Sequence, residues 1–194
     1  MKFIPSIFQL KKVITNEVNF KMLPKNPNKH LLFDQANIRE IYVAGGCFWG
    51  IDAYLARVIG VYETESGYAN GGVENPTYER VCTDTTGFVE VVLVRYDVTK
   101  ITLKALLEEF TTTIDPISLS GKVAAVGTQY RSGIYYTFDA DLPIINEVVN
   151  ELRSKSERPV GIEVGLLENY YPAEDYHQDY LEKNPDGHCH VKFN

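Results

Sequence analysis

The run of residues 88–96 constrains the fold most, because almost every side chain in it is apolar or β-branched. Such a run is typical of a central strand that is covered on at least one face of its sheet. Glu90 is the one carboxylic acid in this run. An unpartnered carboxylate is costly to bury, so a buried Glu90 would keep its proton and could donate it. Alternatively, Glu90 lies on a solvent face near the start of the strand, and the run alone leaves both options open.

Strands and helices alternate along the rest of the chain. Hydrophobic periodicity predicts further strands near residues 41–44, 59–68, 133–138 and 160–166, and helices near 51–58, 102–110 and 141–154. This order predicts an α+β fold, a two-layer α/β sandwich with a ferredoxin-like (split βαβ) core and helices on one face of a mostly antiparallel sheet. Residues 70–77 and 115–131 are expected to form extended loops. The tail from residue 169 is expected to be coiled, without a strand.

The length of 194 residues suits one domain with a substantial core. We therefore expect residues 39–194 to form a single catalytic domain and residues 1–38 to form an N-terminal arm that packs over it or is partly disordered. This arm region is rich in lysine and lacks the features of a secretory signal. No run approaches the length of a membrane span.

The net charge and the cysteine count exclude several classes of protein. A net charge of −7 argues against a protein that mainly binds the phosphate backbone of nucleic acids. Three cysteines are too few, and odd in number, for a secreted disulfide framework. A cytoplasmic, reducing setting is therefore expected, with no membrane partner, and the chain is expected to be a monomer.

Cys47 stands in the glycine-rich stretch 45–50, beside Phe48 and the single tryptophan, Trp49. The flanking patterns place it between a strand and a helix, where free backbone N–H groups favour an anion. A buried, inert structural cysteine is the alternative. A helix terminus contributes roughly 0.3–1 kcal/mol to a nearby charge, less than the about 1.4 kcal/mol of one pKa unit. A reactive thiol here would therefore need help from its substrate.

Histidines and a cysteine near the C-terminus invite a zinc interpretation. His188, Cys189 and His190 are consecutive, however, and so cannot converge on one ion without strain. His177 alone is not enough to complete a set of zinc ligands, and a second cysteine is missing nearby. We therefore expect no metal. Instead, Cys189 follows a turn-forming stretch, residues 184–187, and a thiol near a chain end can act as the resolving partner of a reactive thiol such as Cys47.

Five segments, taken together, resemble the peptide methionine sulfoxide reductase family of the A class. They are residues 46–50 (GCFWG), 75–78 (NPTY), 87–90 (GFVE), 127–132 (GTQYRS), and 176–178 (YHQ) running on to 184–185 (NP). The resemblance covers residues 41–189. It implies reduction of the S-epimer of methionine sulfoxide, free or in proteins, with no metal or organic cofactor and with thioredoxin as the external reductant.

The resemblance also implies a role for each matching residue. Cys47 would attack the sulfoxide sulfur, Phe48 and Trp49 would hold the methyl group, and Glu90 would protonate the sulfoxide oxygen. Tyr78 and Tyr130 would hold that oxygen through their hydroxyl groups. Cys47 would be left as a sulfenic acid, and Cys189 would convert this acid to a disulfide that thioredoxin reduces.

The chain departs from the family pattern at several positions. Ala125 stands where the family usually has an aspartate that orders the hydroxyl network, which predicts weakened but not abolished activity. Asp52 replaces a glutamate, and Cys82 is at a position that is often cysteine without being essential. Two other functions remain open: a thiol peroxidase that also uses Cys47, and a relative that binds methionine sulfoxide without turning it over.

Overall fold

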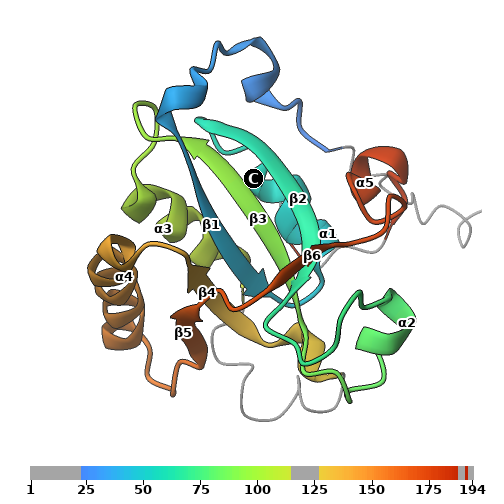
Figure 1. Ribbon diagram of the computed structural model, residues 1–194. Coiled ribbons are helices and arrows are strands. Elements are labelled where there is room, and N and C mark those ends of the chain that lie inside the picture. The colour runs from blue at the N-terminus through green and yellow to red at the C-terminus, as the bar shows by residue number, and fades with distance from the viewer. Residues whose placement is uncertain (1–22, 115–126, 188–190, 192–194) are drawn as a thin grey trace, which may run out of the picture.

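The computed structural model describes residues 23–114, 127–187 and 191. A six-stranded sheet lies at its centre (Figure 1). The strands are β1 (Ile38–Gly45), β2 (Val61–Ala69), β3 (Val89–Asp97), β4 (Ser132–Tyr136), β5 (Ile162–Leu166) and β6 (Tyr170–Pro172). The α-helices are α1 (Phe48–Leu55), α2 (Tyr78–Val81), α3 (Leu103–Thr113), α4 (Leu142–Lys155) and α5 (Tyr180–Lys183). Short 3₁₀ helices are η2 (Pro27–His30), η3 (Gln35–Asn37), η6 (Thr128–Tyr130) and η7 (Asp139–Asp141).

The strand order is β5-β4-β1-β3-β2-β6. The four middle strands, β4-β1-β3-β2, are antiparallel to their neighbours and follow the order β1-α1-β2-β3-α3-β4 along the chain. This is the split βαβ arrangement, so the predicted fold class is confirmed. β5 extends one edge in parallel with β4, and β6 extends the other edge antiparallel to β2.

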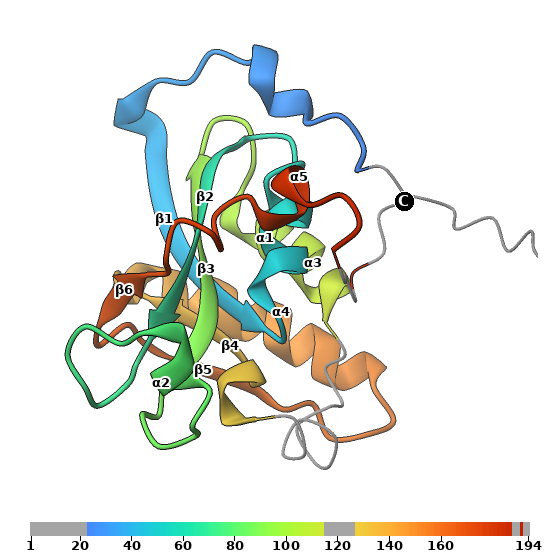
Figure 2. The ribbon, with the colours of Figure 1, turned by 90° about the vertical axis from the view of Figure 1, so that its right-hand side faces the viewer.

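Helices α1, α3 and α4 cover one face of the sheet (Figure 2). Helix α3 shows why: Leu103, Leu106, Leu107 and Phe110 recur at helical spacing and all are buried. The Thr102 side chain caps this helix by accepting a hydrogen bond from the backbone N–H of Ala105. The predicted helix in this region is confirmed.

The segment between β5 and β6 crosses the opposite face of the sheet (Figure 1). It is fixed by Asn70, which donates to the carbonyl of Leu166 and accepts from the backbone N–H of Glu168. Beneath it lies a second apolar cluster, formed by Tyr42, Ala44, Ala69, Val89, Val91, Leu93 and Tyr135. β3 is therefore covered on both faces along part of its length, which agrees with the prediction that at least one face is covered.

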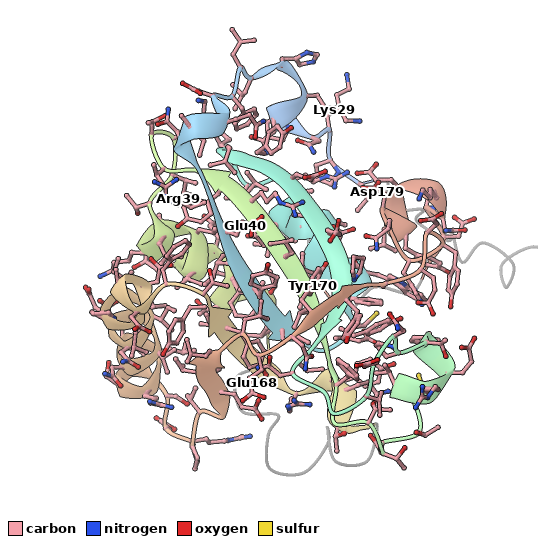
Figure 3. All side chains as sticks on the ribbon, viewed as in Figure 1. Lys29, Arg39, Glu40, Glu168, Tyr170 and Asp179 are labelled. Carbon is pink, nitrogen blue, oxygen red and sulfur yellow. The ribbon has the colours of Figure 1, made fainter. Side chains whose placement is uncertain are left out.

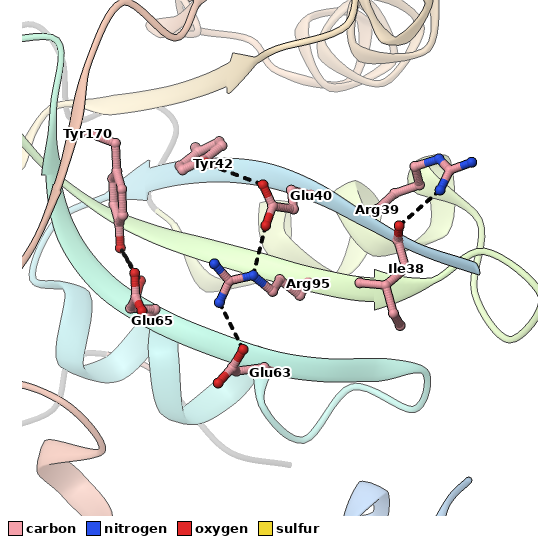
Figure 4. Close-up of polar contacts among 8 residues, drawn as sticks. All are labelled: Ile38, Arg39, Glu40, Tyr42, Glu63, Glu65, Arg95 and Tyr170. Atoms are coloured by element: carbon pink, nitrogen blue, oxygen red, sulfur yellow. Dashed lines mark hydrogen bonds and ion pairs between the residues drawn. The ribbon is translucent and has the colours of Figure 1, made fainter. Parts of the chain in front are cut away.

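The remainder of that face is polar (Figures 3 and 4). Arg95 pairs with Glu40 at 2.7 Å and with Glu63 at 2.8 Å, and the Tyr170 hydroxyl donates to Glu65 at 2.8 Å. These cross-strand charge pairs are partly exposed and therefore contribute little stability individually.

The C-terminal segment differs from its prediction. We expected no strand after residue 169, yet β6 pairs with β2 through Gly67, Tyr68 and Ala69. The strand has only three residues and ends at Pro172, which lacks a backbone N–H and is tolerated at a sheet edge. Three residues are too few to show the alternation of apolar and polar side chains that identifies a strand in the sequence. The strand forms by pairing with the edge of β2.

The described part of the N-terminal arm is attached to the domain through Asn28. Its side-chain amide donates to the carbonyls of Ala56 and Val58, and its oxygen accepts from the backbone N–H of Gly60. Residues 1–22 lie outside the described part, and the division into an arm and a catalytic domain stays a prediction. None of the helices in the described ranges is both long enough and apolar enough to cross a bilayer.

Candidate active site

Cys47 occupies the junction between β1 and α1, as the sequence predicts. It is the N-cap residue of α1, with φ −61° and ψ 124°, and its side chain is partly exposed. Gly46 has φ +86°, a left-handed conformation that glycine adopts without strain, and this turns the chain from strand into helix. Gly45 is required for packing, because a Cβ atom there would lie 2.2 Å from the Cγ2 atom of Ile114.

Glu90 is buried beneath the start of α1. Its exposed fraction is 1%, so the alternative of a solvent-facing Glu90 is wrong. The Glu90 Oε2 atom accepts a hydrogen bond from the backbone N–H of Phe48 at 3.1 Å. Burial raises the pKa of Glu90 from its ordinary 4.5 to about 8, although this hydrogen bond acts in the opposite direction. Glu90 is therefore predominantly a neutral carboxylic acid at pH 7, next to the residue that follows Cys47.

Tyr78 and Tyr130 come together from two short helices that lie far apart in the sequence. Tyr78 begins α2 and Tyr130 ends η6. Burial and a hydrogen bond to Tyr130 raise the pKa of Tyr78. The pKa of Tyr130 is raised by burial first, and then by the nearby Glu90 and Cys47. The structure therefore brings both predicted tyrosines together with the predicted acid and thiol.

Side-chain hydrogen bonds hold the loop that carries Tyr130 against its neighbours. The backbone N–H and the hydroxyl of Thr128 both donate to Asp84 Oδ1, at 2.6 and 2.9 Å. The guanidinium of Arg131 donates to the carbonyls of Gly87 and Phe88, just before β3. Arg131 is thus structural, and it fixes Tyr130 relative to the strand that carries Glu90.

Phe48 and Trp49 form an aromatic wall beside Cys47, but their environments differ. Phe48 is buried and its ring centroid lies 6.0 Å from that of Tyr68. Trp49 is partly exposed and stacks on Tyr180 of α5, with centroids 3.6 Å apart and an interplanar angle of 9°. Figure 2 shows α5 beside α1. The C-terminal segment therefore completes the wall, and Tyr180 is a site residue that sequence reasoning missed.

His177 lies inside this aromatic wall. It is 1% exposed, and its Nδ1 atom accepts a hydrogen bond from the indole N–H of Trp49 at 3.0 Å. Burial lowers the pKa of His177. The ring is therefore neutral at pH 7, with its proton on Nε2. The sequence suggested His177 as a possible zinc ligand and as part of the family segment 176–178, without a role in the site. Its contact with Trp49 spans 128 positions, which no local pattern reveals.

Glu174 was also missed. It follows β6, and its carboxylate accepts hydrogen bonds from the backbone N–H of Tyr78 at 2.9 Å and from the hydroxyl of Tyr68 at 2.8 Å. The nearest signal in the sequence is the concentration of polar and aromatic residues in the tail. That signal does not indicate which of those residues contact the site.

Several predicted residues lie elsewhere or cannot be placed. Cys189 and Ala125 lie outside the described residues, as do His188 and His190. Cys82 is exposed, and the side-chain amide nitrogen of Gln129 is 3.8 Å from its sulfur. Among the residues that the structure describes, no group of three or more His, Cys, Asp or Glu side chains could hold a metal ion.

Fold and site together define a class of protein. A cysteine at a helix start lies together with a neutral buried carboxylic acid and two tyrosine hydroxyl groups, and an aromatic wall stands beside the cysteine. This combination suits a thiol-dependent oxidoreductase that protonates an oxygen atom while sulfur attacks its neighbour.

Comparisons with known proteins identify the family. The family model described as peptide methionine sulfoxide reductase matches residues 39–194. A peptide methionine sulfoxide reductase MsrA from Clostridium perfringens is 53% identical over 155 residues, covering 80% of this chain and 99% of that protein. The chain belongs to the peptide methionine sulfoxide reductase family, and it is an oxidoreductase that reduces methionine sulfoxide.

Solved structures agree with this assignment. The reduced form of Mxr1 from Saccharomyces cerevisiae superposes with a TM-score of 0.75 at 35% identity, covering 83% of this chain and 93% of Mxr1. Mxr1 in complex with Trx2 superposes with a TM-score of 0.54 at 25% identity, covering 78% of this chain and 91% of that one.

Proposed function

We propose that the chain reduces the S-epimer of methionine sulfoxide, free or in proteins, with Cys47 as nucleophile and Glu90 as acid. The observation that carries this proposal is the buried Glu90 carboxyl group bonded to the backbone N–H of Phe48 at 3.1 Å. It places a proton donor beside the cysteine at neutral pH.

The first step reduces the sulfoxide and oxidises Cys47. Glu90 donates a proton to the sulfoxide oxygen, which makes the sulfur electrophilic, and the hydroxyl groups of Tyr78 and Tyr130 hold that oxygen. The Cys47 sulfur attacks the sulfoxide sulfur and forms an S–S bond, while the oxygen takes the thiol proton as well and leaves as water. Water then attacks the Cys47 sulfur, the S–S bond breaks, methionine leaves, and Glu90 regains its proton. Cys47 becomes a sulfenic acid, so methionine is the reduced product and Cys47 is the oxidised group.

Phe48 and Trp49 hold the methyl group of the substrate. Trp49 is partly exposed and is fixed by His177 and Tyr180, so its face can contact a ligand without moving. Phe48 is buried and contributes the deeper part of the wall.

The second step regenerates the thiol. Cys189 attacks the sulfenic acid of Cys47, forming a disulfide and releasing water. Thioredoxin then reduces this disulfide by thiol–disulfide exchange. The solved complex of Mxr1 with Trx2 supports thioredoxin as the reductant.

We further propose that the cycle needs no metal or organic cofactor, since Cys47 and Cys189 carry both electrons. The chain is proposed to act as a monomer in the cytoplasm. Size-exclusion chromatography with light scattering tests the monomeric state, and fractionation of cells tests the cytoplasmic location.

One experiment tests the proposed function. The protein is incubated with peptides that contain S- or R-methionine sulfoxide, or with hydrogen peroxide, in the presence and absence of thioredoxin, and its disulfides are mapped by mass spectrometry. We expect about one methionine per chain from the S-epimer alone, a Cys47–Cys189 disulfide, and turnover only with thioredoxin. Preferred reduction of peroxide would support the thiol peroxidase, and the absence of methionine release would support a binding protein.

A further inference from the structure

Glu174 connects three parts of the chain that are far apart in the sequence. Its Oε1 atom accepts from the backbone N–H of Tyr78, 96 positions away, at 2.9 Å. Its Oε2 atom accepts from the hydroxyl of Tyr68, 106 positions away, at 2.8 Å. Both oxygens of one carboxylate are therefore used to join the C-terminal segment to α2 and to β2.

Glu174 is suited to this task because it is ionised. Partial burial acts to raise its pKa, but the hydrogen bonds that its carboxylate accepts, from the Tyr78 backbone and the Tyr68 hydroxyl among others, outweigh burial and hold the pKa below its ordinary value. An ionised carboxylate only accepts hydrogen bonds, so both donors are satisfied at the same time. Hydrogen bonds to a charged acceptor are stronger than those between neutral groups.

Both partners of Glu174 lead to the site. Tyr78 carries a hydroxyl that is proposed to hold the sulfoxide oxygen. Tyr68 is paired with Glu90 across β2 and β3, and its ring contacts Phe48. Because Tyr78 stands at the first residue of a helix of only four residues, its own helix provides little to fix its backbone. The bond to Glu174 supplies that fixed point.

We propose that Glu174 is a positioning residue for the reduction step: it holds the Tyr78 backbone so that the Tyr78 hydroxyl reaches the sulfoxide oxygen. This inference rests on the proposed role of Tyr78. Glu174 itself does not contact the substrate and exchanges no proton with it. A misplacement of about 1 Å in a reacting group can cost on the order of 100-fold in rate, so the loss of this bond should be measurable.

Three substitutions separate the two bonds of Glu174. Glu174→Ala removes both acceptors. Glu174→Gln keeps one amide oxygen for the Tyr78 N–H, and its NH₂ group can donate to the Tyr68 oxygen, so it should restore most of the rate. Tyr68→Phe removes only the second bond and should cost less than Glu174→Ala.

A double-mutant cycle with Tyr78→Phe tests the proposal. The measured quantity is the single-turnover rate constant for methionine release from an S-methionine sulfoxide peptide, without thioredoxin. We expect Glu174→Ala to lower this constant roughly 10- to 100-fold in the wild-type background. In the Tyr78→Phe background it should cost at most about threefold, because the hydroxyl that Glu174 positions is already absent.

A purely structural role of Glu174 would give the same fold-loss in both backgrounds, and that result would overturn the proposal. No loss in either background would overturn it as well. If Tyr78→Phe alone has no effect, the proposed role of Tyr78 fails, and this inference fails with it. Should Glu174→Ala not fold, the same cycle is run with Glu174→Asp, which keeps the charge but shortens the side chain.

Discussion

The carboxyl group of Glu90 accepts a hydrogen bond from the backbone N–H of Phe48 at 3.1 Å, although the two residues lie 42 positions apart in the sequence. This bond joins the central strand β3 to the first residue of α1. It aligns a buried, protonated acid with the residue next to Cys47. The acid and the nucleophile therefore keep their relative positions as long as the β3–α1 contact is intact.

Trp49→Phe should raise KM for the sulfoxide roughly tenfold and change kcat less. The substitution removes the indole N–H, leaves His177 Nδ1 without its donor, and reduces the stack on Tyr180. These groups shape the pocket in the ground state as well as in the transition state, so their loss appears mainly in KM. Steady-state kinetics at saturating reductant measures both constants.

The exposed Tyr62 provides a control, because Tyr62→Phe also removes a polar group from an aromatic side chain. Tyr62→Phe should change neither constant. A large fall in kcat with unchanged KM in Trp49→Phe would mean that the indole acts on the chemical step instead of on substrate binding.

Cys189→Ser should separate the two halves of the cycle. The first methionine should still be released at the wild-type rate, because Cys47 and Glu90 carry that step. Turnover with thioredoxin should be lost, since no disulfide can form. Rapid quench followed by steady-state assay measures the two quantities, with Cys47→Ser as the control that loses both. Thioredoxin-dependent turnover in Cys189→Ser would show that another group resolves the sulfenic acid.

Ala125→Asp should increase the single-turnover rate constant. The family resemblance implies that an aspartate at this position would order the hydroxyl network, and one additional hydrogen bond contributes about 1 kcal/mol, which corresponds to roughly fivefold in rate. Single-turnover methionine release from the S-epimer is the measurement. An unchanged rate constant would show that the network around Tyr130 does not need the aspartate.

Asp52→Asn should stabilise the protein at neutral pH. Burial first, and then the nearby Asp179 and Glu182, raise the pKa of Asp52 from 3.8 to about 6. The folded state thus holds this proton more tightly than the unfolded state does. This tighter proton binding contributes to the free energy of unfolding; the contribution is fully present below pH 3.8 and is lost as the pH rises through about 6.

Asparagine cannot ionise, so the variant avoids this loss. Its free energy of unfolding at pH 7.5 should exceed that of the wild type by up to about 3 kcal/mol, and the difference should vanish near pH 4. Urea unfolding at both pH values measures it. Asp175 is exposed, and Asp175→Asn should leave the free energy of unfolding unchanged at either pH. A difference that persists at low pH would assign the effect to packing.

The sequence was sufficient to predict the centre of the fold and much of the site. The apolar run that contains Glu90 and the glycine-flanked Cys47 each have a local pattern, and each is located where that pattern predicts. Tyr130 was expected in a loop and Tyr78 directly after one, and only their resemblance to family motifs indicated that the two residues meet. Their meeting depends on the tertiary contacts of Asp84 and Arg131.

The contribution of the C-terminal segment was not predictable from local sequence. β6 and α5 have three and four residues, too few for either hydrophobic period to be recognised. Glu174, His177 and Tyr180 reach the site because β6 pairs with the edge of β2. Burial of a polar side chain such as His177 is a property of the assembled fold, and nothing in the neighbouring sequence indicates it.

The most direct test of the account is the pH dependence of the single-turnover rate constant for methionine release from the S-epimer. If the Glu90 proton drives the reaction, the constant should be level below pH 7 and should fall about tenfold per unit above about pH 8, where Glu90 ionises. Glu90→Gln should lower the constant by roughly 10²- to 10⁴-fold and remove this fall. A rate constant that rises through pH 8, or wild-type activity in Glu90→Gln, would contradict the account.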